Sequence, residues 1–546
     1  MVQINSRPFR FKAIGCSDSR DSTEAFPGAM LQLSNLVPDP STSNQWVCRP
    51  AEFALCVLSG ASYGGGTPGF VSAMRVVGDY LYGMVAMSGG SFNGLDAPFA
   101  VNLMTGAQVI PSGVVPSNCP ASVAATGAWT PPSMDTVSTN VIVCHPGFPV
   151  AGGKVGYFNI SSPGAPTWNV TNMATNDFPV APIAVKNFNG RAYYICNTPG
   201  TTPALVFSDV LAPFTRTNAS QALTFQDSVP LTALGTLQFL NQLGGIVQAL
   251  IVFKGDYNLF QVTGDAAGNT LAQNAMNVAT GTLSPLTLVN SPQGMLFLSP
   301  DGFRLIDQNA KVSEPIGRDG KGITVPFIYA VTPSRVSAVC NAEYLRVSTQ
   351  NGNAPTSPPQ EWIYDLGRNA WCGPHTFPFS LAQAYKNTFI TTPLSVPGQI
   401  WQSDIYQNVN TSFMENGVQM NFMYQTCLIP DEEEDMYQYT VNECYVSVAM
   451  DAFGNDMTAV AQDEKGAALD NTTIPNSTVG SLWGSMVWGV GTWGGTPSFL
   501  ARRAINWNLP LVFSQASFTI QGKSGMGVTF GSLKVNVEHM RYIKQP

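Results

Sequence analysis

One pattern in the sequence is typical of a catalytic serine: Gly60-Ala61-Ser62-Tyr63-Gly64 fits the G-x-S-x-G nucleophile elbow of hydrolases. That elbow requires a strand before the serine and a helix after it. The run that follows, residues 65–69, is rich in glycine and proline and strongly disfavours a helix. The chain has only three histidines, His145, His375 and His539, to serve as a partner base. We therefore interpret the segment as a glycine-rich loop.

The other residue types that carry chemistry lack the necessary spacing. The histidines lie far apart, so a zinc site is not expected, and the prolines beside His145 and His375 indicate turns. Arg318–Gly322 and Gly522–Gly527 contain lysine among glycines but lack the full P-loop pattern. The ten cysteines are scattered without a CxxC pair, which favours reduced structural thiols. We expect no catalytic, cofactor-binding or metal-binding residues and no enzymatic activity.

Two further clusters allow more than one interpretation. Asp431-Glu432-Glu433-Glu434-Asp435 is the only dense run of charge. A solvated loop is the ordinary interpretation; a cation site or an electrostatic docking patch stays open, although the run lacks the spacing of a calcium loop. Tryptophan-glycine pairs recur every five residues, at Trp483, Trp488 and Trp493. Packing between subunits or on a C-terminal sheet is favoured for them over stacking on sugars.

Short hairpin patterns recur through the middle of the chain. Each has Gly, Asn or Asp at a reversal between apolar, β-prone arms, which is the strongest short-range hairpin signal. Seven reversals are predicted, one within Pro146–Gly153 and the others near Gly78, Asn189, Gly255, Asp301, Asn341 and Asn387. Since two hairpins make a four-stranded blade, seven such units predict a β-propeller. A large β-sandwich with a long meander is the alternative.

The rhythm of these patterns divides the chain into three parts. Residues 1–64 are predicted to form an N-terminal arm that belongs to the platform, residues 65–405 a β-propeller-like domain, and residues 406–546 a C-terminal β-sandwich or barrel platform. In the last part, Tyr437–Met450 is the clearest strand, followed by a turn at Phe453–Asp456 and a second arm at 457–461. Closing strands are expected at 516–521 and 528–537. The expected fold class is all-β.

Composition limits the partners. Only 11% of the 546 residues are charged, against about 25% in an average protein, and charge-poor surfaces suit wide protein–protein contacts. With 26 Lys and Arg and a net charge of −8, binding of nucleic acid through counterion release is not expected. The N-terminus shows no secretory signal. The longest apolar run, near Ile246–Phe253, is too short for a membrane-spanning segment.

Several stretches resemble tail proteins of short-tailed bacteriophages. Leu31–Pro40 followed by Arg49-Pro50 resembles the N-terminal signature of tail nozzle proteins, also called tail tubular protein B, and of the related packaged-DNA stabilisation proteins. Leu250–Asp265 and Gly294–Phe303 resemble the middle of that family. The tryptophan-glycine segment followed by Arg502-Arg503 resembles its end.

The resemblance implies a β-propeller mounted on a β platform and a homohexameric ring below the head-to-tail adaptor protein. Genome DNA would pass through the lumen without sequence-specific binding, and tail fibre or needle proteins would be further partners. The expected location is the virion, in the phage tail, after assembly in the host bacterial cytoplasm. The low basic content agrees with a conduit that must release its cargo.

Two other functions stay open on the residues alone. A carbohydrate-binding or carbohydrate-cleaving β-propeller is the first, and a propeller scaffold for host protein partners is the second. A glycosidase needs two facing carboxylates. The candidates Asp79, Asp256 and Asp301 fall at predicted turn tips, where aspartate is favoured for backbone reasons.

Overall fold

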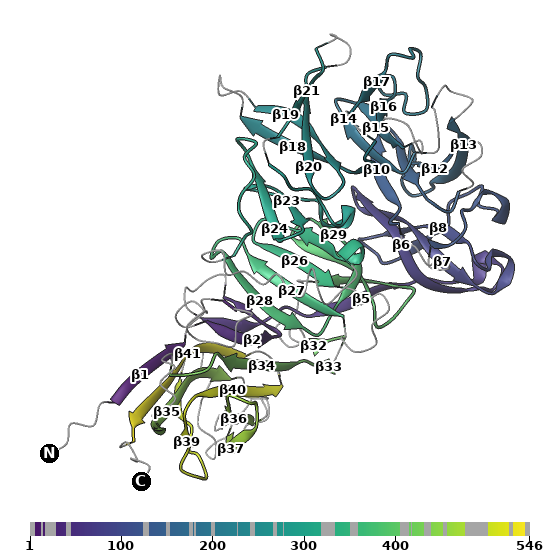
Figure 1. Ribbon diagram of the computed structural model, residues 1–546. Coiled ribbons are helices and arrows are strands. Elements are labelled where there is room, and N and C mark those ends of the chain that lie inside the picture. Colours follow the sequence, from purple (N-terminus) through teal and green to yellow (C-terminus); the bar gives the residue numbers. More distant parts are fainter. Residues whose placement is uncertain are drawn as a thin grey trace.

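The computed structural model describes residues 6–11, 15–16, 29–39, 45–123, 130–148, 153–173, 178, 182–197, 203–225, 228–240, 246–265, 270–276, 278–317, 333–349, 359–403, 414–416, 418–430, 438–450, 456–475, 501–523 and 528–540. Within these ranges the chain is built from strands (Figure 1). The helices there are single 3-10 turns: η1 (Ala61–Tyr63), η2 (Gly90–Phe92), η3 (Pro116–Asn118), η6 (Pro285–Thr287) and η8 (Pro333–Arg335). None of the helices described is long and apolar enough to cross a membrane.

Seven antiparallel sheets form the blades of a propeller. Blade 1 contains β6 (Thr67–Val77), β7 (Tyr80–Ser88), β8 (Asp96–Asn102) and β9 (Gln108–Val109), and blade 2 contains β10 (Ser133–Val137), β11 (Asn140–Cys144), β12 (Lys154–Asn159) and β13 (Thr167–Asn172). Blade 3 contains β14 (Ala184–Phe188), β15 (Arg191–Cys196), β16 (Ala204–Phe207) and β17 (Ala222–Thr224), and blade 4 contains β18 (Leu231–Leu240), β19 (Ile246–Lys254), β20 (Asn258–Thr263) and β21 (Ala272–Ala275). Blade 5 contains β22 (Val289–Ser291), β23 (Gly294–Ser299) and β24 (Gly302–Asp307). Blade 6 contains β25 (Ser337–Cys340), β26 (Tyr344–Thr349), β27 (Gln360–Asp365) and β28 (Ala370–His375), and blade 7 contains β29 (Phe379–Tyr385), β30 (Thr388–Pro393), β31 (Gln399–Ser403) and β5 (Glu52–Val57).

The blades close into a ring because neighbouring blades contact each other all the way round. The innermost strands contact one another from β6 through β10 and β14 to β18, and from β22 through β25 and β29 back to β6; between blades 4 and 5, β18 contacts β23, the second strand of blade 5. Each of the seven predicted reversals lies in a different blade. Four of them, near Gly78, Asn189, Asn341 and Asn387, join the first strand of a blade to the second. The other three join the second strand to the third: Pro146–Gly153 lies between β11 and β12, Gly255 between β19 and β20, and Asp301 between β23 and β24. The propeller is therefore confirmed over the meander sandwich.

Blade 7 shows one error in the predicted boundaries. The arm 1–64 was expected to belong to the platform, but β5 pairs antiparallel with β31, with Val57 opposite Gln399 and Glu52 opposite Ser403. Within this arm, β5 therefore forms the outer strand of blade 7 and not a strand of the platform. Without it, β31 would present an unpaired edge, and closing the ring with a strand from elsewhere in the chain removes that edge.

The platform consists of two antiparallel sheets at the end of the molecule away from blades 2 to 4 (Figure 1). One has the order β3-β4-β41-β35-β38, with β1 added to β41 and β39 to β35. The other has the order β2-β34-β40-β36-β37. The bounds are β1 (Ser6–Phe11), β2 (Met30–Ser34), β3 (Leu36–Pro38), β4 (Trp46–Cys48), β34 (Asn421–Thr426), β35 (Tyr439–Met450), β36 (Met457–Asp463), β37 (Ala468–Ile474), β38 (Ala501–Ala504), β39 (Val512–Phe513), β40 (Ala516–Lys523) and β41 (Val528–His539). A small hairpin, β32 (Met414–Glu415) and β33 (Val418–Gln419), lies beside β5.

The connection after β35 differs from the expectation. We expected β35 and the arm at 457–461 to be joined by a turn as neighbours, but β35 pairs with β41, whereas β36 pairs with β37 and β40 in the other sheet. Both strands carry a half-buried, alternating pattern, which indicates a strand on a sandwich core but does not reveal which sheet it joins.

The core is layered between neighbouring blades. Apolar clusters fill the interfaces from blade 7 round to blade 5. The largest cluster is shared by both platform sheets and by blades 5 and 6, with Trp46, Phe422 and Phe530 on the platform side and Trp362 and Trp371 on the blade side. Platform and propeller are therefore joined by one continuous core, with β28 against β2 and β3.

Candidate functional site in the propeller channel and at the platform junction

The glycine-rich segment at Gly60 is a loop with a single 3-10 turn, η1, and not a strand-to-helix elbow. Gly64 follows in the left-handed conformation, at φ 70°. Ser62 is exposed, while Tyr63 is buried and donates its hydroxyl hydrogen bond to the Pro98 carbonyl at 2.8 Å. The geometry that activates a serine nucleophile is therefore not formed here.

His145 and His375 are both buried, and only the first lies in a turn. The Nε2 atom of His145 lies 2.9 Å from Asp96 Oδ2, which ties blade 2 to blade 1. His375 is the last residue of β28, so the turn predicted for it is wrong; its Nδ1 accepts the Asn35 backbone N–H at 2.9 Å. Asn35 lies between the platform strands β2 and β3, and the sequence around His375 gave no sign of this hydrogen bond.

The remaining candidates do not assemble into a site. Asp79, Asp256 and Asp301 lie in blades 1, 4 and 5 and therefore do not form a facing pair. The described residues contain no group of three His, Cys, Asp or Glu suited to a metal ion. The ten cysteines, all within the described ranges, form no disulfide, and nine of them are buried. Three segments lie outside the described residues: Arg318–Gly322, the acidic run 431–435 and the tryptophan-glycine repeat at 483–494. So does 524–527 of the last glycine run.

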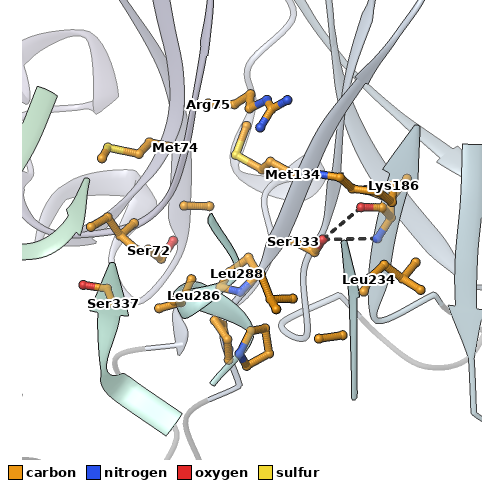
Figure 2. Close-up of a pocket in the computed structure, with 18 of the residues that line it drawn as sticks. Ser72, Met74, Arg75, Ser133, Met134, Lys186, Leu234, Leu286, Leu288 and Ser337 are labelled. Carbon is orange, nitrogen blue, oxygen red and sulfur yellow. Dashed lines mark hydrogen bonds between the residues drawn. The ribbon is translucent and has the colours of Figure 1, made fainter. Parts of the chain in front are cut away.

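The innermost strands of the blades surround a central channel, and the smaller of two pockets in it, which we call its narrow end, has a volume of about 190 Å³. Figure 2 shows this narrow end, whose lining includes Met74 of blade 1, Met134 of blade 2, and Leu286 and Leu288, which precede blade 5. A second pocket of about 570 Å³ shares Arg75 and Lys186 with the narrow end. We call this part the wide end; its polar lining includes Arg75, Asp135, Lys186, Asn187, Gln248, Asn290 and Gln383.

Asp135 joins three blades at the wide end. Its Oδ1 forms an ion pair with Arg75 Nη2 of blade 1 at 2.8 Å, and its Oδ2 accepts the Asn187 backbone N–H of blade 3 at 2.8 Å. Lys186 Nζ lies 3.6 Å from the same oxygen. Burial raises the pKa of the carboxyl, but the charges of Lys186 and Arg75 and the hydrogen bonds outweigh it, so this pKa lies below its usual range.

Ser133 makes a parallel link between the same two blades. Its Oγ accepts the Val185 N–H at 3.1 Å and donates to the Val185 carbonyl at 3.3 Å (Figure 2). The innermost strands β10 and β14 belong to different sheets, so their facing backbone groups need partners from side chains. Ser133 and Asp135 supply them and hold blades 2 and 3 together along the channel.

The interface between blades 6 and 7 contains buried charges. Arg346 of β26 donates from Nε to Glu361 Oε1 at 2.5 Å and from Nη1 to Ser403 Oγ at 2.6 Å, and it also forms an ion pair with Glu52 of β5. Thr391 donates to the second oxygen of Glu52 at 3.1 Å. These partners come from both blades, so the side chain of Arg346 connects the closing strand to its neighbour.

Arg49 extends this network into the platform. Its Nε donates to Asn35 Oδ1 at 3.1 Å, its guanidinium pairs with Glu415, and its Nη1 lies 3.9 Å from Glu52 Oε1. Asn35 in turn donates to His375. We call the set Arg49, Glu52, Arg346, Glu361, Glu415, Asn35 and His375 the junction network. It lies where the chain passes from the platform strand β4 to the propeller strand β5.

Two guanidinium groups face three carboxylates in the junction network, so the ionised set would carry an excess negative charge. Burial accordingly raises the pKa of Glu52 to about 7, against the opposing effect of Arg346 and Arg49. Burial also lowers the pKa of His375 well below its ordinary value, and the nearby charges of Arg49 and Arg346 add to this effect. The imidazole is therefore neutral.

Comparison with known proteins bears on the fold alone. No protein-family model matches the chain, and no curated protein matches it in sequence. Among solved structures, the Dos1 propeller is 11% identical and matches with a TM-score of 0.36 over 69% of this chain and 93% of that one. The SapL1 lectin in complex with alpha methyl fucoside is 14% identical, with a TM-score of 0.30 over 58% and 96% of the two chains.

A puromycin-hydrolysing peptidase of Mycobacterium tuberculosis is 10% identical, with a TM-score of 0.36 over 69% of this chain and 61% of that one. These proteins differ from one another in what they bind or cleave, and at such TM-scores the likeness carries no argument about function. The blade count and the platform topology rest on this chain's own strand pairing. The chain is an all-β protein in which a seven-bladed β-propeller is joined to a two-sheet β platform.

Proposed function

We propose that the protein is a structural component of a short-tailed phage tail, namely a nozzle ring below the head-to-tail adaptor that retains genome DNA and conducts it during ejection. The stretches that resemble this family are spread over the whole body. Leu31–Pro40 contains β2 and β3 of the platform, Arg49 lies in the junction network, and Leu250–Asp265 and Gly294–Phe303 contain the central hairpins of blades 4 and 5.

The observation that carries the proposal is the rigid union of propeller and platform. One apolar core spans both, and the junction network fixes their connection with buried ion pairs. Domains that move relative to each other share small polar interfaces, whereas a large apolar interface holds them in one orientation. A ring that withstands the pressure of packaged DNA requires such rigid subunits.

The channel inside one propeller is too small to be the DNA path. Its wide end holds about 570 Å³, a volume typical of small-molecule pockets, and its narrow end holds only about 190 Å³. A DNA conduit would therefore have to lie between copies of the chain, in the lumen of a symmetric ring. Low charge over the surface suits the wide contacts of such a ring.

Native mass spectrometry combined with negative-stain electron microscopy tests the proposal. The full chain is purified and imaged alone and with the adaptor protein of a short-tailed phage. We expect sixfold rings, or a monomer that becomes a sixfold ring on the adaptor. A chain that stays monomeric with the adaptor, and that binds or cleaves sugars on a glycan array, would contradict the nozzle and favour the carbohydrate function.

A further inference from the structure

The wide end of the propeller channel carries an excess of positive charge. Arg75 and Lys186 are the two cations of its lining, and Asp135 is the one carboxylate among the described residues that line it. This excess is notable in a chain with a net charge of −8. Two cations against one anion favour an anionic occupant.

Both cations have donors that Asp135 does not use. Lys186 Nζ lies 3.6 Å from the carboxylate, which is beyond hydrogen-bond distance. Arg75 pairs with Asp135 through Nη2, and its side chain is still 33% exposed, whereas that of Lys186 is 23% exposed. A ligand oxygen in the cavity can therefore pair with both cations at once.

The lining around the two cations suits a small polar molecule. Asn187, Gln248, Asn290 and Gln383 place amide groups around the same cavity, and amides can donate to and accept from hydroxyl groups. The volume of about 570 Å³ falls within the range of small-molecule sites, about 300–1,000 Å³. Polymers such as a DNA duplex do not fit.

We propose that the wide end of the channel binds a small oxyanion, a carboxylate or phosphate group carried by a hydroxyl-rich molecule. Arg75 and Lys186 hold the oxyanion, and the amides contact the rest of the ligand. The site is complete within one chain because all the lining residues belong to one propeller. Binding therefore does not require ring formation and can be measured whether or not the nozzle proposal holds.

Isothermal titration calorimetry on the full chain tests the site, with inorganic phosphate and gluconate as separate probes at low ionic strength. We expect saturable binding of one of them, and the tighter probe identifies the type of oxyanion. Lys186→Met should weaken that binding roughly tenfold or more, because a charge-assisted hydrogen bond is lost. Lys154→Met, on β12 of blade 2 and away from the channel lining, is the matched control and should leave the affinity unchanged.

Asp135→Asn provides a test in the opposite direction. The variant removes the carboxylate that competes with the ligand for Arg75 and Lys186, so the ligand should bind more tightly. Misfolding would weaken binding and cannot produce this gain in affinity. Circular dichroism confirms the fold of each variant. The proposal is overturned if neither probe binds saturably, if Lys186→Met and Lys154→Met behave alike, or if folded Asp135→Asn binds no more tightly than the parent chain.

Discussion

Arg346 is the side chain on which the interface between blades 6 and 7 depends. Replacing it with leucine would remove the cation that pairs with buried Glu361 and would leave Glu52 with only the longer contact to Arg49, at 3.9 Å. Removing one partner of a buried ion pair costs about 3–5 kcal/mol, because the remaining charge is uncompensated. We expect Arg346→Leu to lower the urea midpoint of unfolding by a corresponding amount, as followed by tryptophan fluorescence.

An exposed ion pair serves as the control for this loss. Lys386 Nζ lies 3.0 Å from Asp79 Oδ1 between blades 7 and 1, with both side chains at least half exposed. Because solvent screens such a pair, Lys386→Ala should leave the urea midpoint nearly unchanged. Equal losses in the two variants would show that burial of the junction network contributes nothing.

Glu52 should make the stability of the protein depend on pH. Its pKa is raised from 4.5 to about 7 in the folded chain, so the folded state holds this proton more tightly than the unfolded state. The resulting stabilisation is fully present below about pH 4.5 and is lost as pH rises through 7. At about 1.4 kcal/mol per pKa unit, the difference approaches about 3 kcal/mol.

Comparison with Glu52→Gln isolates this contribution. The parent chain should lose stability relative to the variant between pH 5 and pH 8, measured as the difference of their urea midpoints at each pH. A difference that is constant over this range, or that changes with the opposite sign, would show that Glu52 is ionised throughout.

The sequence predicted the residues that form turns with their neighbours, but it did not predict the residues that pair with distant parts of the chain. Gly78 and Asn189 have positive φ angles of 60° and 50°. Glycine and asparagine favour such turns, so their positions in the sequence predicted the reversals. Glu52 and Arg346 are 294 positions apart, and nothing near either residue indicates the other. Arg49 stood out in the family resemblance, but its role in the junction network emerged only from the fold.

At the scale of elements, β5 is an edge strand, as is the outer strand of every other blade. It pairs with β31 alone, on the outer edge of blade 7, whereas β11 and β15 are each paired on both sides. Edge elements open at a smaller free-energy cost than central strands. Buried thiols on these strands, Cys56, Cys144 and Cys196, can report the opening.

We expect Cys56 to react with iodoacetamide earlier than Cys144 and Cys196 in urea below the unfolding midpoint. Labelling is followed by mass spectrometry of the peptides, and the already half-exposed Cys119 serves as the control for reagent activity. Simultaneous labelling of all three buried thiols would mean that blade 7 opens only with the whole propeller.

Central strands were easy to predict because they are buried on both faces. The stretch Ala249–Lys254 of β19 is buried throughout, and such continuous apolar runs beside turn residues mark each blade. Strand order in the platform could not be predicted in this way. The pairing of β1 and β4 with β41 joins residues at opposite ends of the described chain, and no local pattern encodes such a partner.

At the scale of the whole molecule, assembly should be insensitive to salt. Only 11% of residues are charged, so contacts between copies would rest mainly on apolar and uncharged polar surface, which ions do not screen. If the ring forms, it should keep its mass in 1 M NaCl by analytical ultracentrifugation. Dissociation at high salt would show that ion pairs hold the copies together.

The same ring should not bind duplex DNA tightly through its own charges. With 26 Lys and Arg in 546 residues and a net charge of −8, little release of counterions from a duplex is expected. Gel-shift assays with linear double-stranded DNA should show no complex even at low salt, with a basic DNA-binding protein as the positive control. A complex that weakens steeply with salt would reveal a basic surface and contradict the expected passage.

The pairing of β5 with β31 imposes a delay during synthesis of the chain, because β5 is made long before its partner strand. The ribosome makes the two strands about 340 residues apart, which at roughly 5–20 residues per second takes on the order of 20–70 s. Until β31 leaves the ribosome, β5 has no partner strand, and β1 stays unpaired for still longer, until β41 is made. Neither half of the nascent chain can mature alone, so a chain cut short before residue 528 would leave the earliest strands exposed to aggregation and to quality-control proteases.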